Sequence, residues 1–165
     1  MDYHPITKAI TSILQGNNAW HETFEHEPVR TSQEAAELRH GYGLAQGAKA
    51  ILLRVKVNES EKFFVMLVFP AHLHFDKVKV KKFFHARDIR FATEQEVGEL
   101  TNGILPGGVP PFGNLFNLRV IVDPKLFDNE KIIFNAGDRR FSVAMRADDY
   151  KRIVNPELID ITSNQ

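Results

Sequence analysis

The stretch Gly41-Tyr-Gly-Leu-Ala-Gln-Gly-Ala-Lys49-Ala-Ile-Leu-Leu-Arg54 places three glycines and a lysine ahead of an apolar run. A phosphate-binding loop requires the pattern G-x-x-x-x-G-K-[ST] at the start of a helix. Here no two of the glycines have four residues between them, Ala48 separates Gly47 from Lys49, and no Ser or Thr follows the lysine. The stretch therefore carries no motif for nucleotide hydrolysis.

The residues after Lys49 predict a strand. Ile51-Leu-Leu-Arg-Val-Lys-Val57 alternates apolar and charged residues at its end, which is typical of a half-buried strand. A second strand is predicted over Lys62–Phe69, and Asn58-Glu-Ser-Glu61 is the hairpin loop between them. A lysine at the entrance of such a strand is either solvated or held in a pocket as a fixed cation.

Predicted helices and strands surround this hairpin. Helices are expected from Pro5 to Gly16, after the capping box Thr31-x-x-Glu34, from the capping box Thr93-x-x-Glu96 to about Thr101, and over Ala147–Val154, whose first turn holds Asp148 and Asp149. Strands are expected over 20–25, 88–91, 118–122, 131–135, 141–145 and 158–161. Because strands dominate the middle and helices are inserted between them, we expect a mixed α/β or α+β fold in one compact domain, residues 1–165.

Asp76-Lys-Val-Lys-Val-Lys-Lys-Phe-Phe84 fits two structures. Residues 77–81 alternate like an edge strand, whereas Val80, Phe83 and Phe84 share one helical face with Asp76 as the N-cap. A helix is favoured because Asp76 is a good cap and a lysine-rich run prefers helix to strand.

Composition and charge exclude several kinds of chemistry and of cellular location. The chain has 165 residues and no cysteine, which excludes disulfides, a thiol nucleophile and thiolate zinc sites. Its N-terminus lacks the pattern of a signal peptide and its longest apolar run, Phe63–Phe69, is too short to span a membrane, so we expect a cytoplasmic protein. Formal net charge is zero, but the Lys77–Lys82 run and the Arg139-Arg140 pair are local cations, either solvated or facing phosphates.

The segment Gly107-Gly-Val-Pro-Pro-Phe-Gly113 combines exposed backbone with fixed geometry. Glycines leave backbone N–H groups uncovered, and the two prolines fix φ and hold the turn in place. Such a loop is either a structural connection or a set of preorganised donors to a carbonyl or carboxylate oxygen. On a strand, His72-x-His74 would place two imidazoles on one face, but neither HExxH nor a third ligand stands nearby, and no G-x-S-x-G elbow supports a serine nucleophile.

Four segments in a fixed order carry a family resemblance. They are Phe24-Glu-His-Glu-Pro28, Gly47-Ala-Lys49-Ala-Ile-Leu52, Thr101 to Gly113, and Phe134-Asn-Ala-Gly-Asp-Arg-Arg-Phe-Ser142. The chain resembles the YbaK-type aminoacyl-tRNA deacylase family, whose members are similar to the editing insertion domain of bacterial prolyl-tRNA synthetase. The resemblance implies a compact domain around a mixed, partly barrel-like sheet with short helices packed around it.

The resemblance also implies a function and a site. A trans-acting editing enzyme would hydrolyse the ester of a mischarged tRNA that carries a small amino acid such as Ala, Ser, Cys or Pro. Lys49 matches the family's lysine at a strand entrance, and Gly107-Gly108-Val109-Pro110-Pro111 matches its G-x-x-x-P loop, which shapes the amino-acid pocket with backbone groups. Attack by water would be assisted by the terminal ribose hydroxyl, with orientation and oxyanion stabilisation in place of a catalytic triad.

Two positions depart from the family pattern. Phe24 stands where some members have a tyrosine, and Ser142 stands where some have an aspartate, so a hydroxyl and a carboxylate are missing. Both residues are expected to line the substrate pocket. Pocket polarity controls discrimination between substrates, so the edited amino acid is not fixed by the resemblance.

The expected partners are the aminoacylated acceptor end of tRNA and, in addition, an aminoacyl-tRNA synthetase; no cofactor, metal or membrane partner is expected. A non-catalytic module that binds an amino acid, an aminoacyl group or a protein on the same scaffold is the alternative function. A metal hydrolase that uses His72 and His74 is a third interpretation.

Overall fold

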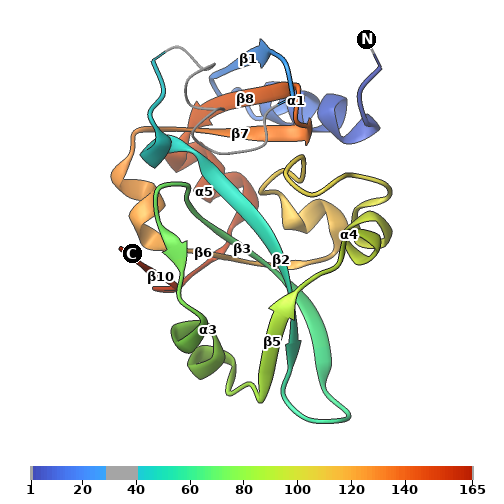
Figure 1. The fold of residues 1–165 in the computed structure, drawn as a ribbon. Helices are drawn as coiled ribbons and strands as arrows, with labels where there is room; N and C mark the ends of the chain where they lie inside the picture. The colour runs from blue at the N-terminus through green and yellow to red at the C-terminus, as the bar shows by residue number, and fades with distance from the viewer. Residues whose placement is uncertain (1, 29–40, 165) are drawn as a thin grey trace.

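The hairpin of β2 (Ala48–Lys56) and β3 (Lys62–Pro70) is the centre of the fold (Figure 1). The structure is a computed structural model that describes residues 2–28 and 41–164. Both faces of the hairpin are buried: Met66 and Val68 belong to one apolar cluster, and Leu67 and Phe69 belong to another. This double burial explains why β3 is a continuous apolar run instead of an alternating one.

Three more strands extend the hairpin into a five-stranded sheet with the order β5-β2-β3-β6-β9. β5 (Asp88–Phe91) is antiparallel to β2, β6 (Arg119–Val122) is parallel to β3, and β9 (Glu157–Leu158) is parallel to β6. The sheet is therefore mixed, as the family resemblance implies.

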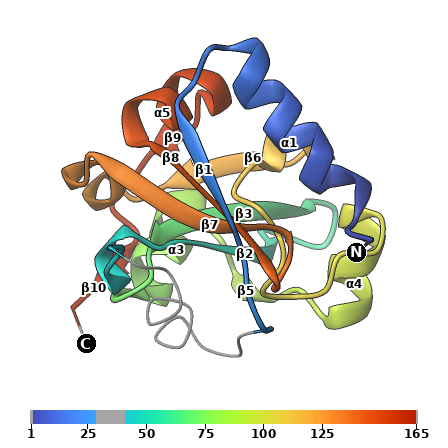
Figure 2. The ribbon, with the colours of Figure 1, turned by 90° about the horizontal axis from the view of Figure 1, so that it is seen from above.

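A second sheet lies across one end of the first (Figure 2). It has the order β1-β8-β7 and is antiparallel, with β1 (His21–Glu25), β7 (Lys131–Asp138) and β8 (Phe141–Arg146), and α1 (Pro5–Gly16) packs beside it. A bridge between Gly47 and Ile133 joins β7 to the entrance of β2. A two-stranded sheet pairs β4 (His74–Phe75) with β10 (Thr162–Ser163). The mixed α/β class that the sequence predicts is confirmed. Within the described residues, none of these sheets closes into a barrel, so the sheet that the resemblance implies is present without barrel closure.

The predicted helix caps are present. Asp76 caps α3 (Lys77–Phe84) by accepting hydrogen bonds from the N–H groups of Val78 and Lys79, which settles the ambiguity of that segment in favour of helix. Thr93 and Glu96 form the predicted capping box of α4 (Glu94–Thr101). α5 covers Ala147–Val154, and single turns of 3-10 helix cover 44–46, 113–116 and 124–128. The capping box at Thr31 lies outside the described residues.

Two expectations about strands are wrong. His72 lies in a turn ahead of β4, so it does not share a strand face with His74. The strand expected over 158–161 ends at Leu158. The N–H of Ile159 still donates to Val122 O, but at Ile161 a buried carboxylate replaces the sheet partner: Asp123 Oδ2 accepts from the N–H of Ile161 at 3.0 Å and from Thr162 Oγ1 at 2.7 Å. No described helix is long and apolar enough to cross a membrane.

Replacing Asp123 tests this account of the C-terminal segment. In Asp123→Ala the buried donors of Ile161 and Thr162 lose their acceptor, and the free energy of unfolding should fall by about 1–3 kcal/mol for each. Urea unfolding monitored by circular dichroism measures this change.

Asp160→Ala is the matched control. Asp160 is 58% exposed and pairs only with lysine side chains among the described residues, whereas the Asp123 side chain is fully buried. The control should change stability by less than about 1 kcal/mol. Equal effects of the two substitutions would contradict the assigned role of Asp123.

Candidate functional site

One row of residues crosses the three-stranded sheet and holds two of the predicted pocket residues. Phe24 on β1 is the register partner of Ser142 on β8, and Ser142 is also the partner of Asn135 on β7. Residues directly opposite one another in an antiparallel sheet project from the same face. The structure therefore brings Phe24 and Ser142 together, and it adds Asn135 as the third residue of the row.

Asn135 connects this row to the glycine-rich loop. Its Oδ1 accepts a hydrogen bond from Ser142 Oγ at 3.1 Å, and its Nδ2 donates to the carbonyl oxygen of Gly107 at 2.7 Å. A register shift follows Asn135 in β7, and there the N–H of Gly137 donates to the carbonyl oxygen of Gly108 at 2.8 Å. Two successive carbonyls of the loop thus point at β7.

The far end of the loop is fixed in the core. The hydroxyl of Tyr150 on α5 donates to the carbonyl oxygen of Pro111 at 2.6 Å, and the ring of Phe112 packs against Phe134 and Tyr150. Burial raises the pKa of the Tyr150 hydroxyl far above its usual value, so it remains a hydrogen-bond donor. Val109, Pro110 and Pro111 are buried. The loop is therefore held at Gly107, Gly108 and Pro111.

The orientation of the peptide groups determines which N–H groups of the loop are available to donate a hydrogen bond to a ligand. In a trans peptide the N–H points opposite to the carbonyl, so the N–H groups of Gly108 and Val109 point away from β7. The N–H of Gly108 donates to Leu105 O at 3.0 Å. Within the described part of the chain, the N–H groups of Gly107 and Val109 make no hydrogen bond. Gly107 has a φ of +88°, a conformation in which a side chain is strained.

His26 extends the network on the other side of Ser142. Its Nδ1 lies 2.8 Å from the carbonyl oxygen of Glu27 and its Nε2 lies 2.8 Å from Ser142 Oγ. A carbonyl only accepts, so Nδ1 carries a proton. Ser142 Oγ therefore lies between His26 Nε2 and Asn135 Oδ1, and these contacts connect His26 through Ser142 and Asn135 to the carbonyl oxygen of Gly107.

Lys49 is the second residue of β2 and its side chain is exposed. Gly47 is bridged to Ile133, and Lys49 and Asn135 each lie two residues beyond that bridge in parallel segments. Because side chains alternate along a strand, both point to the same side as the bridged pair. On β7, Ile133 contacts the entrance of β2 and Asn135 contacts the loop. These two residues are two positions apart along the strand, which corresponds to about 6–7 Å. Lys49 is thus near the row, although the described contacts do not link it directly to the loop.

A tyrosine hydroxyl lies beside Phe24 although Phe24 itself has none. The ring of Tyr42 meets that of Phe24 edge to face at 6.0 Å between centroids, and its hydroxyl donates to Glu22 Oε1 at 2.8 Å. Burial, and then the hydrogen bond to Glu22, raises the pKa of Tyr42 to about 12. The sequence analysis missed Tyr42, and it also missed His26 and Asn135, although both lie inside segments that carry the family resemblance.

The described side chains do not support the interpretation as a metal hydrolase. Over residues 2–28 and 41–164, no group of three or more His, Asp or Glu side chains is placed to hold a metal ion. The arrangement offers instead backbone N–H donors, a hydrogen-bonded polar row and a nearby lysine cation. Such an arrangement can bind an anion or stabilise a developing oxyanion.

Comparison with known proteins identifies the class. Residues 26–153 match the family model described as the aminoacyl-tRNA editing domain. The chain is 33% identical over 152 residues to the Multifunctional Ser/Thr-tRNA deacylase ProXp-y of Escherichia coli (strain K12), covering 92% of this chain and 89% of that protein. The chain belongs to the aminoacyl-tRNA editing domain family.

Solved structures agree with the fold. A protein described as a trans-editing enzyme for prolyl tRNA synthetase superposes with a TM-score of 0.79 at 22% identity, over 98% of this chain and 99% of that one. The hypothetical protein APE2540 gives a TM-score of 0.79 at 20% identity, over 93% and 99%. Together these findings confirm the family resemblance found in the sequence and the predicted enzyme class, an aminoacyl-tRNA editing hydrolase.

Removing the Tyr150 hydroxyl tests the anchoring of the loop. Tyr150→Phe leaves the buried Pro111 carbonyl without its donor, so stability should fall by about 1–3 kcal/mol, as measured by thermal and urea unfolding. Tyr3→Phe is the control, because the Tyr3 hydroxyl bonds Glu25 in an exposed contact and its loss should cost less than about 1 kcal/mol. Equal stabilities of wild type and Tyr150→Phe would show that this bond does not hold the loop.

Proposed function

We propose that this protein is a trans-acting editing enzyme that hydrolyses the ester of mischarged aminoacyl-tRNA in the pocket beside Lys49 and the Gly107–Pro111 loop. The observation that supports this best is the hydrogen-bond chain from Ser142 through Asn135 to the carbonyl of Gly107. It fixes the backbone of the loop in a chain that belongs to the editing family. The edited amino acid is small, such as Ala, Ser, Cys or Pro.

The loop backbone carries the catalytic role in this proposal. Gly107 and Gly108 form the turn that binds the ester carbonyl oxygen, with the N–H groups of Gly107 and Val109 as donors because the N–H of Gly108 is already bonded to Leu105. These donors are preorganised by the bonds from β7, so they need no rearrangement as negative charge develops on the oxygen. Val109, Pro110, Pro111, Phe24 and Ser142 shape the amino-acid pocket.

The reaction requires no protein nucleophile. A water oxygen attacks the ester carbonyl carbon, and the bond from that carbon to the terminal ribose oxygen breaks. The neighbouring ribose hydroxyl accepts a proton from the water and relays a proton to the leaving oxygen, so the products are the free amino acid and a tRNA with an intact 3′ end. Orientation of the ester within the loop supplies much of the rate enhancement. Lys49 contacts the substrate on its terminal adenosine side.

The partner is the aminoacylated acceptor end of tRNA, and residues 1–165 act as one editing domain in the cytoplasm, where tRNA is charged. A synthetase is a further partner in this proposal, because an editing enzyme in trans must meet the mischarged tRNA soon after its release. The relative with 33% identity is named as acting on Ser- and Thr-tRNA, so Thr belongs in any substrate panel beside the four small amino acids.

A panel of mischarged tRNAs tests the function. Wild type should release one or a few amino acids from tRNAs charged with Ala, Ser, Thr, Cys or Pro. Lys49→Ala should lower this rate by at least about 100-fold with the fold retained, since Lys49 fixes the substrate in its reactive orientation. Acid-gel or filter assays of the remaining aminoacyl-tRNA measure both rates.

Lys56→Ala is the matched control on the same strand. Lys56 is paired with Glu59 at the hairpin end of β2, away from the loop, so the substitution should leave deacylation unchanged. If folded wild-type protein releases no amino acid from any tRNA, the binding-module function replaces the editing proposal. If Lys49→Ala is as active as wild type, the role of Lys49 is wrong.

A further inference from the structure

A cleft lies on the outer side of the glycine-rich loop, against the N-terminal segment. Its volume is about 650 Å3, and its walls include Tyr3, Leu105, Gly108, Asp138 and Arg139. One wall is the loop backbone that the proposed function uses, so the cleft is continuous with the candidate site. Its volume falls in the range of about 300–1,000 Å3 that is usual for small-ligand pockets.

The opposite wall of the cleft is held in place by the N-terminal segment. His4 Nδ1 accepts from the N–H of Ile6, so in the neutral ring Nε2 is the donor, and it lies 2.8 Å from the carbonyl oxygen of Asn102. This bond joins the start of α1 to the segment that enters the loop. Hydrogen bonds therefore hold both walls of the cleft, from Asn135 to the loop on one side and from the His4 ring to Asn102 on the other.

Four charged side chains line the cleft, those of Asp2, Asp138, Arg139 and Arg140, and two of them pair with each other. Asp138 is engaged by Arg140, whose Nε and Nη2 donate to its two oxygens at 2.9 and 2.7 Å, and this contact lowers the pKa of Asp138. The Arg140 guanidinium also lies over the Tyr3 ring, 5.3 Å from the centroid. Arg139, in contrast, makes no ion pair with any residue in the described ranges.

Arg139 is fixed by its stem and not by its charge. A Cβ added to Gly107 would lie 3.2 Å from Arg139 Cδ, so the side chain packs directly over the glycine. The guanidinium is always charged and presents several N–H donors, which suits a phosphate group. Leu105, which also lines the cleft, is 53% exposed and offers it an apolar surface.

We propose that this cleft binds the single-stranded RNA next to the aminoacylated nucleotide, with Arg139 on a backbone phosphate and Leu105 against a base or ribose. The inference rests on the proposed function, because the RNA lies there while its ester is in the loop. One cation beside an apolar surface matches the alternation of phosphate and nucleoside in a single strand. The Lys77–Lys82 run cannot serve this purpose, since α3 lies at the opposite end of the molecule (Figure 1).

Binding of uncharged tRNA tests the inference without any reaction. The probes are a tRNA transcript and the same transcript without its four unpaired 3′ nucleotides. Arg139→Gln keeps side-chain carbons as far as Cδ over Gly107 and removes the charge, so the loop should keep its structure. It should weaken binding of the intact transcript about tenfold. It should also lower the slope of log K against log salt by about 0.7.

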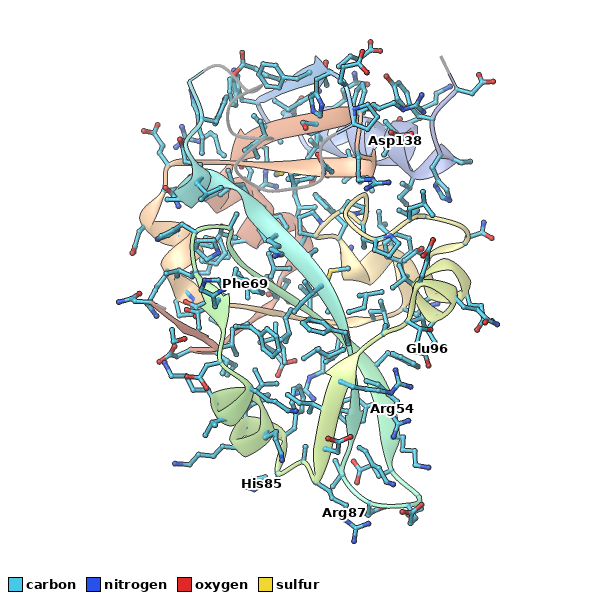
Figure 3. All side chains as sticks on the ribbon, in the orientation of Figure 1. Arg54, Phe69, His85, Arg87, Glu96 and Asp138 are labelled. Carbon is cyan, nitrogen blue, oxygen red and sulfur yellow. The ribbon has the colours of Figure 1, made fainter. Side chains whose placement is uncertain are left out.

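Arg87→Gln is the matched control. Figure 3 shows Arg87 and Asp138 at opposite ends of the molecule, and Arg87 is exposed beside Glu59. This control should bind both transcripts like wild type, and Arg139→Gln should bind the truncated transcript like wild type. Equal binding of the intact transcript by wild type and Arg139→Gln overturns the inference, as does an equal loss with the truncated one.

A free nucleotide is the other source of a phosphate. If adenosine monophosphate occupies the cleft in an Arg139-dependent way and the intact transcript gains nothing from its 3′ end, the cleft binds a free nucleotide and the inference fails. The deacylation panel separates this failure from failure of the proposed function. Wild type active on a mischarged tRNA, with Arg139→Gln unaltered in binding, would refute the cleft assignment alone.

Discussion

The amide of Asn135 is the contact on which the candidate site depends. It accepts from Ser142 and donates to the carbonyl of Gly107, so one side chain joins the polar row on the sheet to the loop. The neighbouring bond from Gly137 to the carbonyl of Gly108 repeats the attachment with backbone atoms. Both bonds come from β7, which is also bridged to the entrance of β2. β7 thereby holds both the entrance of β2 and the glycine-rich loop, and β8, its neighbour in the sheet, pairs with the β1 strand that carries Phe24.

In the function that we propose, this arrangement lets an editing site work without a triad. An aminoacyl ester is already activated, so the demand on the protein is orientation and stabilisation of charge on one oxygen. Neutral hydrogen bonds can hold a loop for that purpose. Some members of the YbaK-type family carry an aspartate at the position of Ser142. Here Ser142 is fully buried and donates a neutral hydrogen bond to Asn135. Tyr42 places a hydroxyl next to Phe24, which has none.

Local signals in the sequence predicted most of the fold. Periodicity and caps placed α1, α3, α4 and α5 because Asp76, Thr93 and the apolar stripes act over only a few residues. The strand expected at 158–161 ends at Leu158, and beyond it the N–H of Ile161 bonds the Asp123 carboxylate, a contact between residues about forty positions apart. No local sequence pattern predicts a hydrogen-bond partner so distant along the chain.

The site shows the same limit. Phe24, Ser142 and Gly107 were identified from motifs, but their connection runs through Asn135 and His26, whose roles depend on strand register and a β-bulge. A polar residue between Phe134 and Ala136 in a buried strand was the available signal. Sequence alone could not show whether that amide meets water or the loop.

The most direct test of the account is the single-turnover rate of deacylation by Asn135→Leu, measured with saturating enzyme on the best substrate. Leucine has nearly the same shape as asparagine but cannot donate to the Gly107 carbonyl. If the loop backbone must be held by β7, the rate falls about 10- to 100-fold while the protein stays folded and still binds the tRNA. A folded variant that deacylates at the wild-type rate would contradict the central claim.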